Sequence, residues 1–192
     1  MKSIPHRLLP VLSGLVLSLI LVLAGTSPGQ SLDRPVAAWS TDKRFIDHGD
    51  GTISDTRTGL MWAKEDSYLD TGRWMNWREG FSYVKDLNDT TFAGYIDWRM
   101  PTLEELRTLY EPDKTNSSQV GSEMVIHVDP IFAKEGCGAL WSSEENGHFN
   151  SFGVIFNTGT RFSANKKSRS RKATRAVRFI QNPDFRRKYL QQ

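Results

Sequence analysis

The sequence predicts an α+β domain in which short antiparallel strands flank two helices. Three observations lead to this prediction. Turn-forming residues separate short apolar runs over residues 45–62, and two amphipathic stretches begin with helix-capping residues near positions 76 and 102. Alternating apolar residues then return after position 150. Short strands on both sides of two helices are typical of the α+β class, with strands joined by turns.

The first predicted elements are the strands of an antiparallel hairpin. Asp50 and Gly51 form a dipeptide that favours a tight turn, and residues 52–54 have the composition of a strand. A second turn over residues 56–59 leads into the apolar residues 60–62. We therefore expect short strands joined by tight turns at the start of the domain.

Two helices are predicted next. The first covers residues 77–87, and Asn76 stands where an N-cap is favoured. The second covers residues 102–110, because Thr102 and Glu105 have the spacing of a capping box, in which each side chain accepts a backbone N–H. The apolar residues that recur at helical spacing in the first helix are Trp77, Phe81, Val84 and Leu87.

Strands are predicted again in the second half of the domain. Residues 151–157 alternate between polar and apolar, residues 157–160 favour a hairpin turn, and residues 175–180 form a final strand. Residues 181–192 are basic and polar, and we expect a frayed tail there. The residues expected to be buried include Trp62, Phe81, Trp98, Leu106, Trp141, Val154, Phe156 and Val177.

The N-terminal end has the pattern of an export signal. A basic start precedes an apolar run over residues 8–25, and small or turn-forming residues follow. We expect residues 1–30 to be a signal peptide cleaved near position 25. The alternative is an uncleaved membrane anchor, since 18 apolar residues approach the length of a membrane span. Residues 31–42 are expected to be a linker, and the protein to be periplasmic, surface-exposed or secreted.

Candidate nucleophiles and metal ligands are sparse in this sequence. Cys137 is the single cysteine, so one chain cannot form an internal disulfide. We expect Cys137 to be a small buried residue, with a reactive nucleophile as the alternative. His48, His127 and His148 lack the spacing of a zinc site. We therefore expect neither a metal site nor another cofactor.

One group of polar residues has both a catalytic and a structural interpretation. Asp97, Trp98, Arg99 and Thr102 lie together where a strand meets a helix. Residues of these types at such a corner commonly fix the chain locally, and capping already accounts for Thr102. Ser142 lacks the glycines of a nucleophile elbow, so we expect it to be a core residue. The structural interpretation is favoured for all of them.

Two acidic regions could bind calcium. Asp47, Asp50 and Asp55 lie in turns, but the order of a calcium-binding loop is missing, and turn chemistry accounts for them. Residues 144–146 read Glu-Glu-Asn and could belong to a calcium-dependent sugar site. We favour a solvated loop for this second region.

Charge is distributed unevenly along the chain. Residues 31–160 carry 12 basic and 21 acidic residues, whereas residues 161–192 carry 11 basic residues and one acidic residue. A dense cluster of one sign attracts polyanions and releases their counterions on binding. We expect an exposed basic loop or edge, with a flexible solvated loop as the alternative. The candidate ligand-binding residues are Arg161, Lys166, Lys167, Arg169, Arg171, Lys172 and Arg175.

The composition of this basic run bears on the class of partner. Phe162 is its one aromatic residue, which disfavours base stacking and a specific nucleic-acid module. Because export is expected, an anionic polysaccharide or another envelope polymer is the favoured partner. Membrane contact is expected only through an uncleaved N-terminal segment, and the oligomeric state is left open.

Several short blocks of the sequence form an ordered series. They are residues 45–47, 49–53, 55–62 and 94–102 with Glu105 and Leu106, followed by residues 129–132, 141–143 and 175–178. Taken in order, these blocks resemble the Lcl C-terminal domain family, which is named after the Legionella collagen-like adhesin. The match covers about residues 43–180. One departure is Ala176, where many relatives have a cysteine that Cys137 might have bridged.

The resemblance implies a C-type-lectin-like fold with two helices, small antiparallel sheets and long loops. It also implies polyanion binding as a function to consider, since the adhesin binds sulfated polysaccharides. We expect an exported binding or adhesion module rather than an enzyme. The alternative is an enzyme of the formylglycine-generating type, which shares that fold group, or a hydrolase, using Cys137 or Asp97. A deep cleft with either residue at its floor would favour the enzyme.

Overall fold

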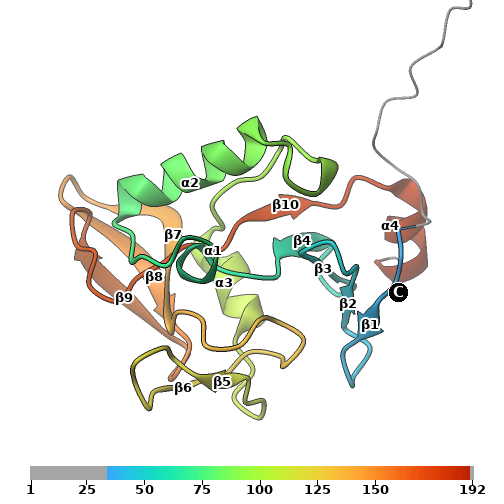
Figure 1. Cartoon of the computed structure of the whole chain (residues 1–192), viewed down its shortest axis with the longest axis horizontal. Helices are drawn as coiled ribbons and strands as arrows, with labels where there is room; N and C mark the ends of the chain where they lie inside the picture. Colours follow the sequence, from blue (N-terminus) through green and yellow to red (C-terminus); the bar gives the residue numbers. More distant parts are fainter. Residues whose placement is uncertain (1–33, 191–192) are drawn as a thin grey trace, which may run out of the picture.

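The computed structural model describes residues 34–190, and Figure 1 shows two main sheets at opposite ends of the molecule, with helices between and beside them. All strand pairings between named strands are antiparallel. The domain is therefore of the mixed α and β class with small antiparallel sheets, as the sequence predicts. Within the described residues, no helix combines the length and apolar composition that a membrane span requires. The predicted signal segment lies outside residues 34–190.

The larger sheet is built by the predicted hairpins and the last strand. Its five strands, in spatial order, are β1 (Ala38–Trp39), β2 (Phe45–Asp47), β3 (Thr52–Asp55), β4 (Leu60–Ala63) and β10 (Val177–Phe179). Trp62 lies opposite Ile53 on one side and Val177 on the other. All three side chains are fully buried, so this row forms part of the core.

The second sheet contains three strands that follow one another in the chain. They are β7 (Ala139–Asn146), β8 (Asn150–Ile155) and β9 (Thr160–Asn165), and β9 is an edge strand. Gly153 lies opposite both Trp141 and Phe162. A Cβ atom at Gly153 would lie 2.4 Å from the Phe162 ring, so glycine makes room for that ring. The Phe162 ring then packs on Trp141, with 5.1 Å between the ring centroids.

Both predicted helices are present and begin as expected. Helix α2 (Trp77–Asp89) starts with a capping box between Asn76 and Glu79, and α3 (Leu103–Leu109) starts with one between Thr102 and Glu105. The structure adds two short helices that the sequence analysis did not predict, α1 (Ser67–Thr71) and α4 (Pro183–Tyr189). A 3₁₀ turn, η1 (Phe92–Gly94), and a strand pair, β5 (Ser117–Ser118) with β6 (Val125–Ile126), complete the fold.

The expected burial is confirmed for seven residues and is wrong for Phe81. Phe81 is 43% exposed, because the buried face of α2 is centred on Gly80 and not on Phe81. A Cβ atom at Gly80 would lie 3.3 Å from the Met100 side chain, so that face packs too closely for a large residue. Phe81 therefore points away from the core. The residues confirmed as buried are Trp62, Trp98, Leu106, Trp141, Val154, Phe156 and Val177.

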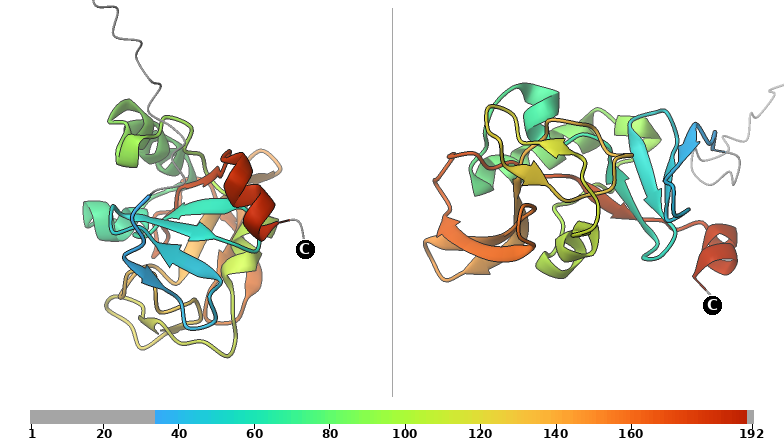
Figure 2. Two further views of the ribbon diagram at one scale, coloured as in Figure 1. Left: turned by 90° about the vertical axis from the view of Figure 1, so that its right-hand side faces the viewer. Right: turned by 90° about the horizontal axis from the view of Figure 1, so that it is seen from below.

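The ordered elements extend beyond the expected domain of residues 43–180. Strand β1 lies within the expected linker and pairs with β2. The expected frayed tail instead contains α4, which Asn182 caps and whose Phe185 side chain is buried. Trp39 of β1 and Tyr189 of α4 lie 6.4 Å apart between ring centroids. Both ends of the described chain thus lie near the larger sheet, and β9 lies at the opposite end of the molecule (Figures 1 and 2).

Candidate functional site

The connection between β9 and β10 carries most of the predicted ligand-binding cations. We call residues 166–172 of this connection the basic turn. It leaves the edge strand β9 at the end of the molecule that lies opposite α4 (Figure 1). The structure divides the seven predicted residues into buried, paired and free cations.

Two of the seven cations are buried, so the expectation of an exposed run is wrong for them. Lys166 is 7% exposed, and its ammonium donates to the carbonyls of Gly147 and His148 and pairs with Glu145. Arg175 is 6% exposed, and its guanidinium donates to the carbonyl of Ala63 at 2.8 Å. Both side chains are therefore held by the interior of the domain.

Of two further cations, Arg161 lies over an aromatic ring and Arg169 is paired with a carboxylate. Arg161 lies over the Phe152 ring, on the face of β9 opposite to Phe162. Arg169 forms an ion pair with Glu79 of α2, and a hydrogen bond from its Nε is 2.9 Å long. This hydrogen bond from Arg169 lowers the pKa of Glu79. Arg169 is nevertheless exposed at the surface of the basic turn.

Lys167, Arg171 and Lys172 form no ion pair with any of the described residues. The side chains of Lys167 and Arg171 are exposed. Lys172 is half-buried, with its ammonium 5.6 Å from the Trp141 ring and 5.8 Å from the Phe162 ring. Burial lowers the pKa of Lys172.

A groove of about 320 Å³ runs beside β9 and is bounded by the basic turn. Its apolar part includes Phe162 and Ile155, and its cationic part consists of Arg171 and Lys172. We call this feature the β9 groove. The remaining lining residues are Gln119, Met124, Ala139, Ser163, Ala164 and Ser170.

A second, larger groove lies between α2 and α3 and has a volume of about 600 Å³. Phe81 and Phe179 line it, and both are largely exposed. Its arginine, Arg99, stacks on Phe179 and is paired with Glu105. This groove explains where Phe81 points, but it offers fewer free charges than the β9 groove.

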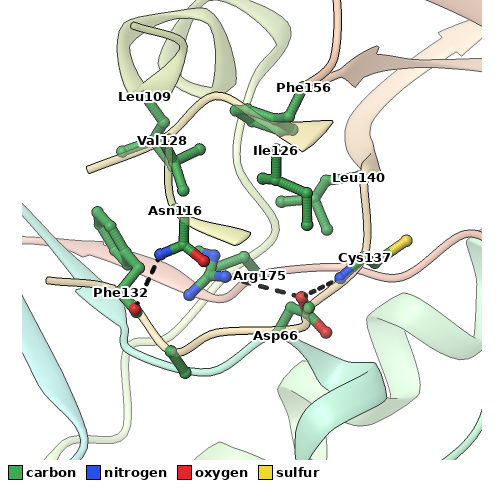
Figure 3. Close-up of a pocket in the computed structure, with 12 residues that line it drawn as sticks. Asp66, Leu109, Asn116, Ile126, Val128, Phe132, Cys137, Leu140, Phe156 and Arg175 are labelled. Carbon is green, nitrogen blue, oxygen red and sulfur yellow. Dashed lines mark hydrogen bonds and ion pairs between the residues drawn. The ribbon is translucent and has the colours of Figure 1, made fainter. Parts of the chain in front are cut away.

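Cys137 lines a small interior cavity and is not at the floor of a cleft. The cavity measures about 10 Å³, room for about one water molecule, and Figure 3 shows it between Asp66, Arg175 and apolar side chains. Cys137 is 3% exposed, and burial raises the pKa of its thiol. The expectation of a buried residue is confirmed, and these properties do not support a thiolate nucleophile.

The residues at the strand-to-helix corner form structural contacts. Asp97 pairs with Arg178 at 2.6 Å, and Arg99 pairs with Glu105 at 2.6 Å. The backbone N–H and carbonyl of Trp98 both bond to the side chain of Asn88. These contacts agree with the structural interpretation, and the partners include charged side chains as well as backbone groups.

The acidic turn residues are also engaged within the domain. Asp47 accepts from the Gly49 N–H and pairs with Lys64, while Asp55 pairs with Arg44 in the interior. In the other region, Glu144 accepts from the N–H of Leu103 at the start of α3, Glu145 pairs with Lys166, and Asn146 donates to Ser163.

One cluster of carboxylates resembles a cation site in its spacing. Oxygens of Asp42, Glu111 and Asp129 lie within 4.8 Å of one another. The ammonium of Lys114 pairs with all three, at 2.6 Å from Asp129 and 2.8 Å from Asp42. Burial would lower the pKa of Lys114, but its carboxylate partners outweigh burial and raise it. The cluster is therefore an ion-pair network centred on a lysine.

Comparisons with known proteins agree with the resemblance seen in the sequence. A search of curated proteins finds no match to this chain. The model of the family described as the Lcl C-terminal domain matches residues 51–178, which is more than half of the chain. This span runs from the turn before β3 to the centre of β10. The chain therefore belongs to the Lcl C-terminal domain family.

Proposed function

We propose that this protein is an exported, adhesin-like module that binds an anionic polysaccharide through the basic turn. The observation behind the proposal is that Lys167, Arg171 and Lys172 lie close together in the chain and lack acidic partners among the described residues. Arg169 adds a fourth charge, which Glu79 partly neutralises. A cluster of unneutralised cations binds polyanions mainly through the release of counterions.

Family membership supports an extracellular binding role, and the N-terminal sequence pattern supports export. The C-type-lectin-like assignment is part of the same proposal, and two capped helices with small antiparallel sheets support it. Cys137 is buried and Asp97 is paired, so neither observation favours an enzyme.

The decisive test is retention on a heparin column as salt is raised. Exposed charges are screened over about 8 Å at physiological ionic strength, so retention of the wild type should fall steeply with added salt. The variant Lys167→Ser/Arg169→Ser/Arg171→Ser removes three exposed cations and leaves the buried Lys166 and Arg175 in place. It should elute at clearly lower salt than the wild type.

A matched control removes the same charge from the opposite end of the molecule. Arg57, Arg186 and Lys188 are exposed and lie in the β3–β4 turn and in α4. The variant Arg57→Ser/Arg186→Ser/Lys188→Ser should elute close to the wild type. Equal losses in the two variants would show that net charge alone governs retention, and the proposed surface would then be rejected.

A further inference from the structure

We propose that the β9 groove holds a single anionic substituent of a sugar, such as a sulfate, phosphate or carboxylate group, between Arg171, Lys172 and Gln119. The inference rests on the proposed function and narrows it from a charged surface to a defined site. Four observations support it: within residues 34–190 a cation lacks an acidic partner and an amide donor lacks an acceptor, and the groove has an apolar lining and a suitable volume.

The first observation is the position of Lys172. Its ammonium donates to the hydroxyl of Ser168 and the carbonyl of Ser170, both neutral acceptors, and meets no carboxylate among the described residues. The Trp141 and Phe162 rings, which pack on each other, both lie beside it. A half-buried ammonium without a counter-charge is stabilised when an anion binds next to it.

The second observation is the side-chain amide of Gln119. This side chain lines the β9 groove and is 2% exposed. Its oxygen accepts from the N–H of Gly138 at 2.9 Å, which fixes the amide orientation. Its nitrogen has no hydrogen-bond partner within residues 34–190. Buried donors are normally satisfied. This nitrogen is closed to solvent, so a movement of the lining side chains that opens it to the groove would let an anionic oxygen supply the acceptor that it lacks.

The third observation is the apolar part of the groove lining. Phe162 and Ile155 line the groove together with Ala139 and Ala164. Gly153 leaves the space into which the Phe162 ring fits, so the ring is held in place. A bare inorganic anion gains nothing from an apolar wall, whereas the C–H face of a sugar ring can pack on one. The combination indicates an anionic group carried on a sugar.

The fourth observation is the size of the β9 groove. Its volume of about 320 Å³ is at the lower end of small-molecule sites. This space suits one sugar unit with its substituent rather than a long segment of a chain. The remaining units of a polysaccharide would then run over the exposed part of the basic turn.

The proposal can be tested with small probes at physiological salt. Glucose 6-sulfate, glucose and inorganic sulfate are titrated separately into the full-length protein, and binding is followed by calorimetry and by the NMR signal of the Gln119 side-chain amide. Glucose 6-sulfate should bind and shift this signal. Inorganic sulfate lacks the sugar ring, so it should bind at least about tenfold more weakly than glucose 6-sulfate. Glucose, which lacks the charge, should not bind.

Two substitutions test the donors separately. Lys172→Met removes the charge but keeps a long side chain beside the two rings. Gln119→Glu keeps the acceptor for Gly138 and replaces the free donor with a carboxylate oxygen. Each should weaken glucose 6-sulfate binding about tenfold or more. Lys188→Met and Gln181→Glu make the same changes near the opposite end and should leave binding unchanged.

The outcomes separate this site from the proposed function. If glucose 6-sulfate binds no more tightly than inorganic sulfate, or binds Lys172→Met as well as the wild type, the β9 groove is not a sugar site. Retention on heparin that still depends on Lys167, Arg169 and Arg171 would leave the proposed function standing in that case. If Gln119→Glu fails to fold, Lys172→Met and the Gln119 amide signal of the wild type still decide the question.

Discussion

Arg175 Nη2 lies 3.7 Å from Asp66 Oδ2 in the interior of the domain. The same Asp66 caps α1 through its other oxygen and accepts the backbone N–H of Cys137 at 2.8 Å. Arg175 also donates to the carbonyls of Ala63 and Lys64. This pair therefore connects the end of β4, helix α1, the segment before β7 and the segment before β10 (Figure 3).

Asp66→Asn should destabilise the domain strongly. The substitution leaves the buried guanidinium of Arg175 without its counter-charge, and breaking a buried pair costs about 3–5 kcal/mol of the free energy of unfolding. Chemical denaturation measures this change. Asp89→Asn, which breaks the exposed pair between Lys85 and Asp89, is the control and should change stability little. A similar small change for Asp66→Asn would show that the buried pair is not structural.

Acid should weaken the contact between Arg99 and Glu105. Burial would raise the pKa of Glu105, but hydrogen bonds from Arg99 and Thr102 outweigh burial and lower it below the ordinary value of 4.5. A lowered pKa stabilises the fold above the unfolded value, and this contribution disappears as pH falls through the folded value.

Glu105→Gln tests this effect because glutamine can still form the capping box. The variant should be less stable than the wild type at neutral pH, and the difference should shrink as the pH falls below 4.5. Urea unfolding of both proteins across this range measures the difference. A difference independent of pH would contradict an electrostatic origin.

The orientation of α2 makes a prediction about two residues of the same helix. Phe81 is 43% exposed and Leu87 is 8% exposed. Phe81→Ala should lower the free energy of unfolding by about 1 kcal/mol or less, through its contact with Trp77. Leu87→Ala should lower it by about 2–5 kcal/mol. Thermal or chemical unfolding measures both losses. A larger loss for Phe81→Ala than for Leu87→Ala would show that Phe81 lies on the buried face.

Cys137 should be unreactive in the folded protein. Burial raises the pKa of its thiol, and the Sγ lies within hydrogen-bond distance of the carbonyls of Ala139 and Arg171, either of which can accept its one hydrogen. A thiol reagent should therefore modify Cys137 in urea but not under native conditions. Prompt modification of the native protein would show that the thiol is open to solvent.

Local signals in the sequence were sufficient for the elements that depend on nearby residues. The turns around Gly51 and Gly159 and the capping boxes of α2 and α3 involve residues within four positions of one another. Helix α4 was missed because its signal, Asn182 followed by Pro183, is short, and because Phe185 is buried in a core cluster whose other members come mostly from distant elements. Burial of Phe81 was overestimated because a glycine occupies the centre of the buried face.

The candidate site was only partly predictable for the same physical reason. The density of cations after residue 160 pointed to the part of the chain that contains the basic turn. Which cations are neutralised depends on partners far away in the chain, such as Glu79, which lies 90 positions from Arg169. The β9 groove combines Gln119, Phe162 and Lys172, and no spacing along the chain connects these three residues before the fold brings them together.

The contact between Trp39 and Tyr189 places both ends of the described chain beside the larger sheet, opposite the basic turn. One end of the molecule therefore holds both ends of the described chain, and the other end holds the basic turn. A covalent attachment through residue 34 or residue 190 leaves the β9 groove at the outer end. Many copies held on a surface in this way would present the same cationic end to the medium. If the proposed function holds, a long anionic polymer would contact several copies at once, and the combined avidity would exceed the affinity of each copy.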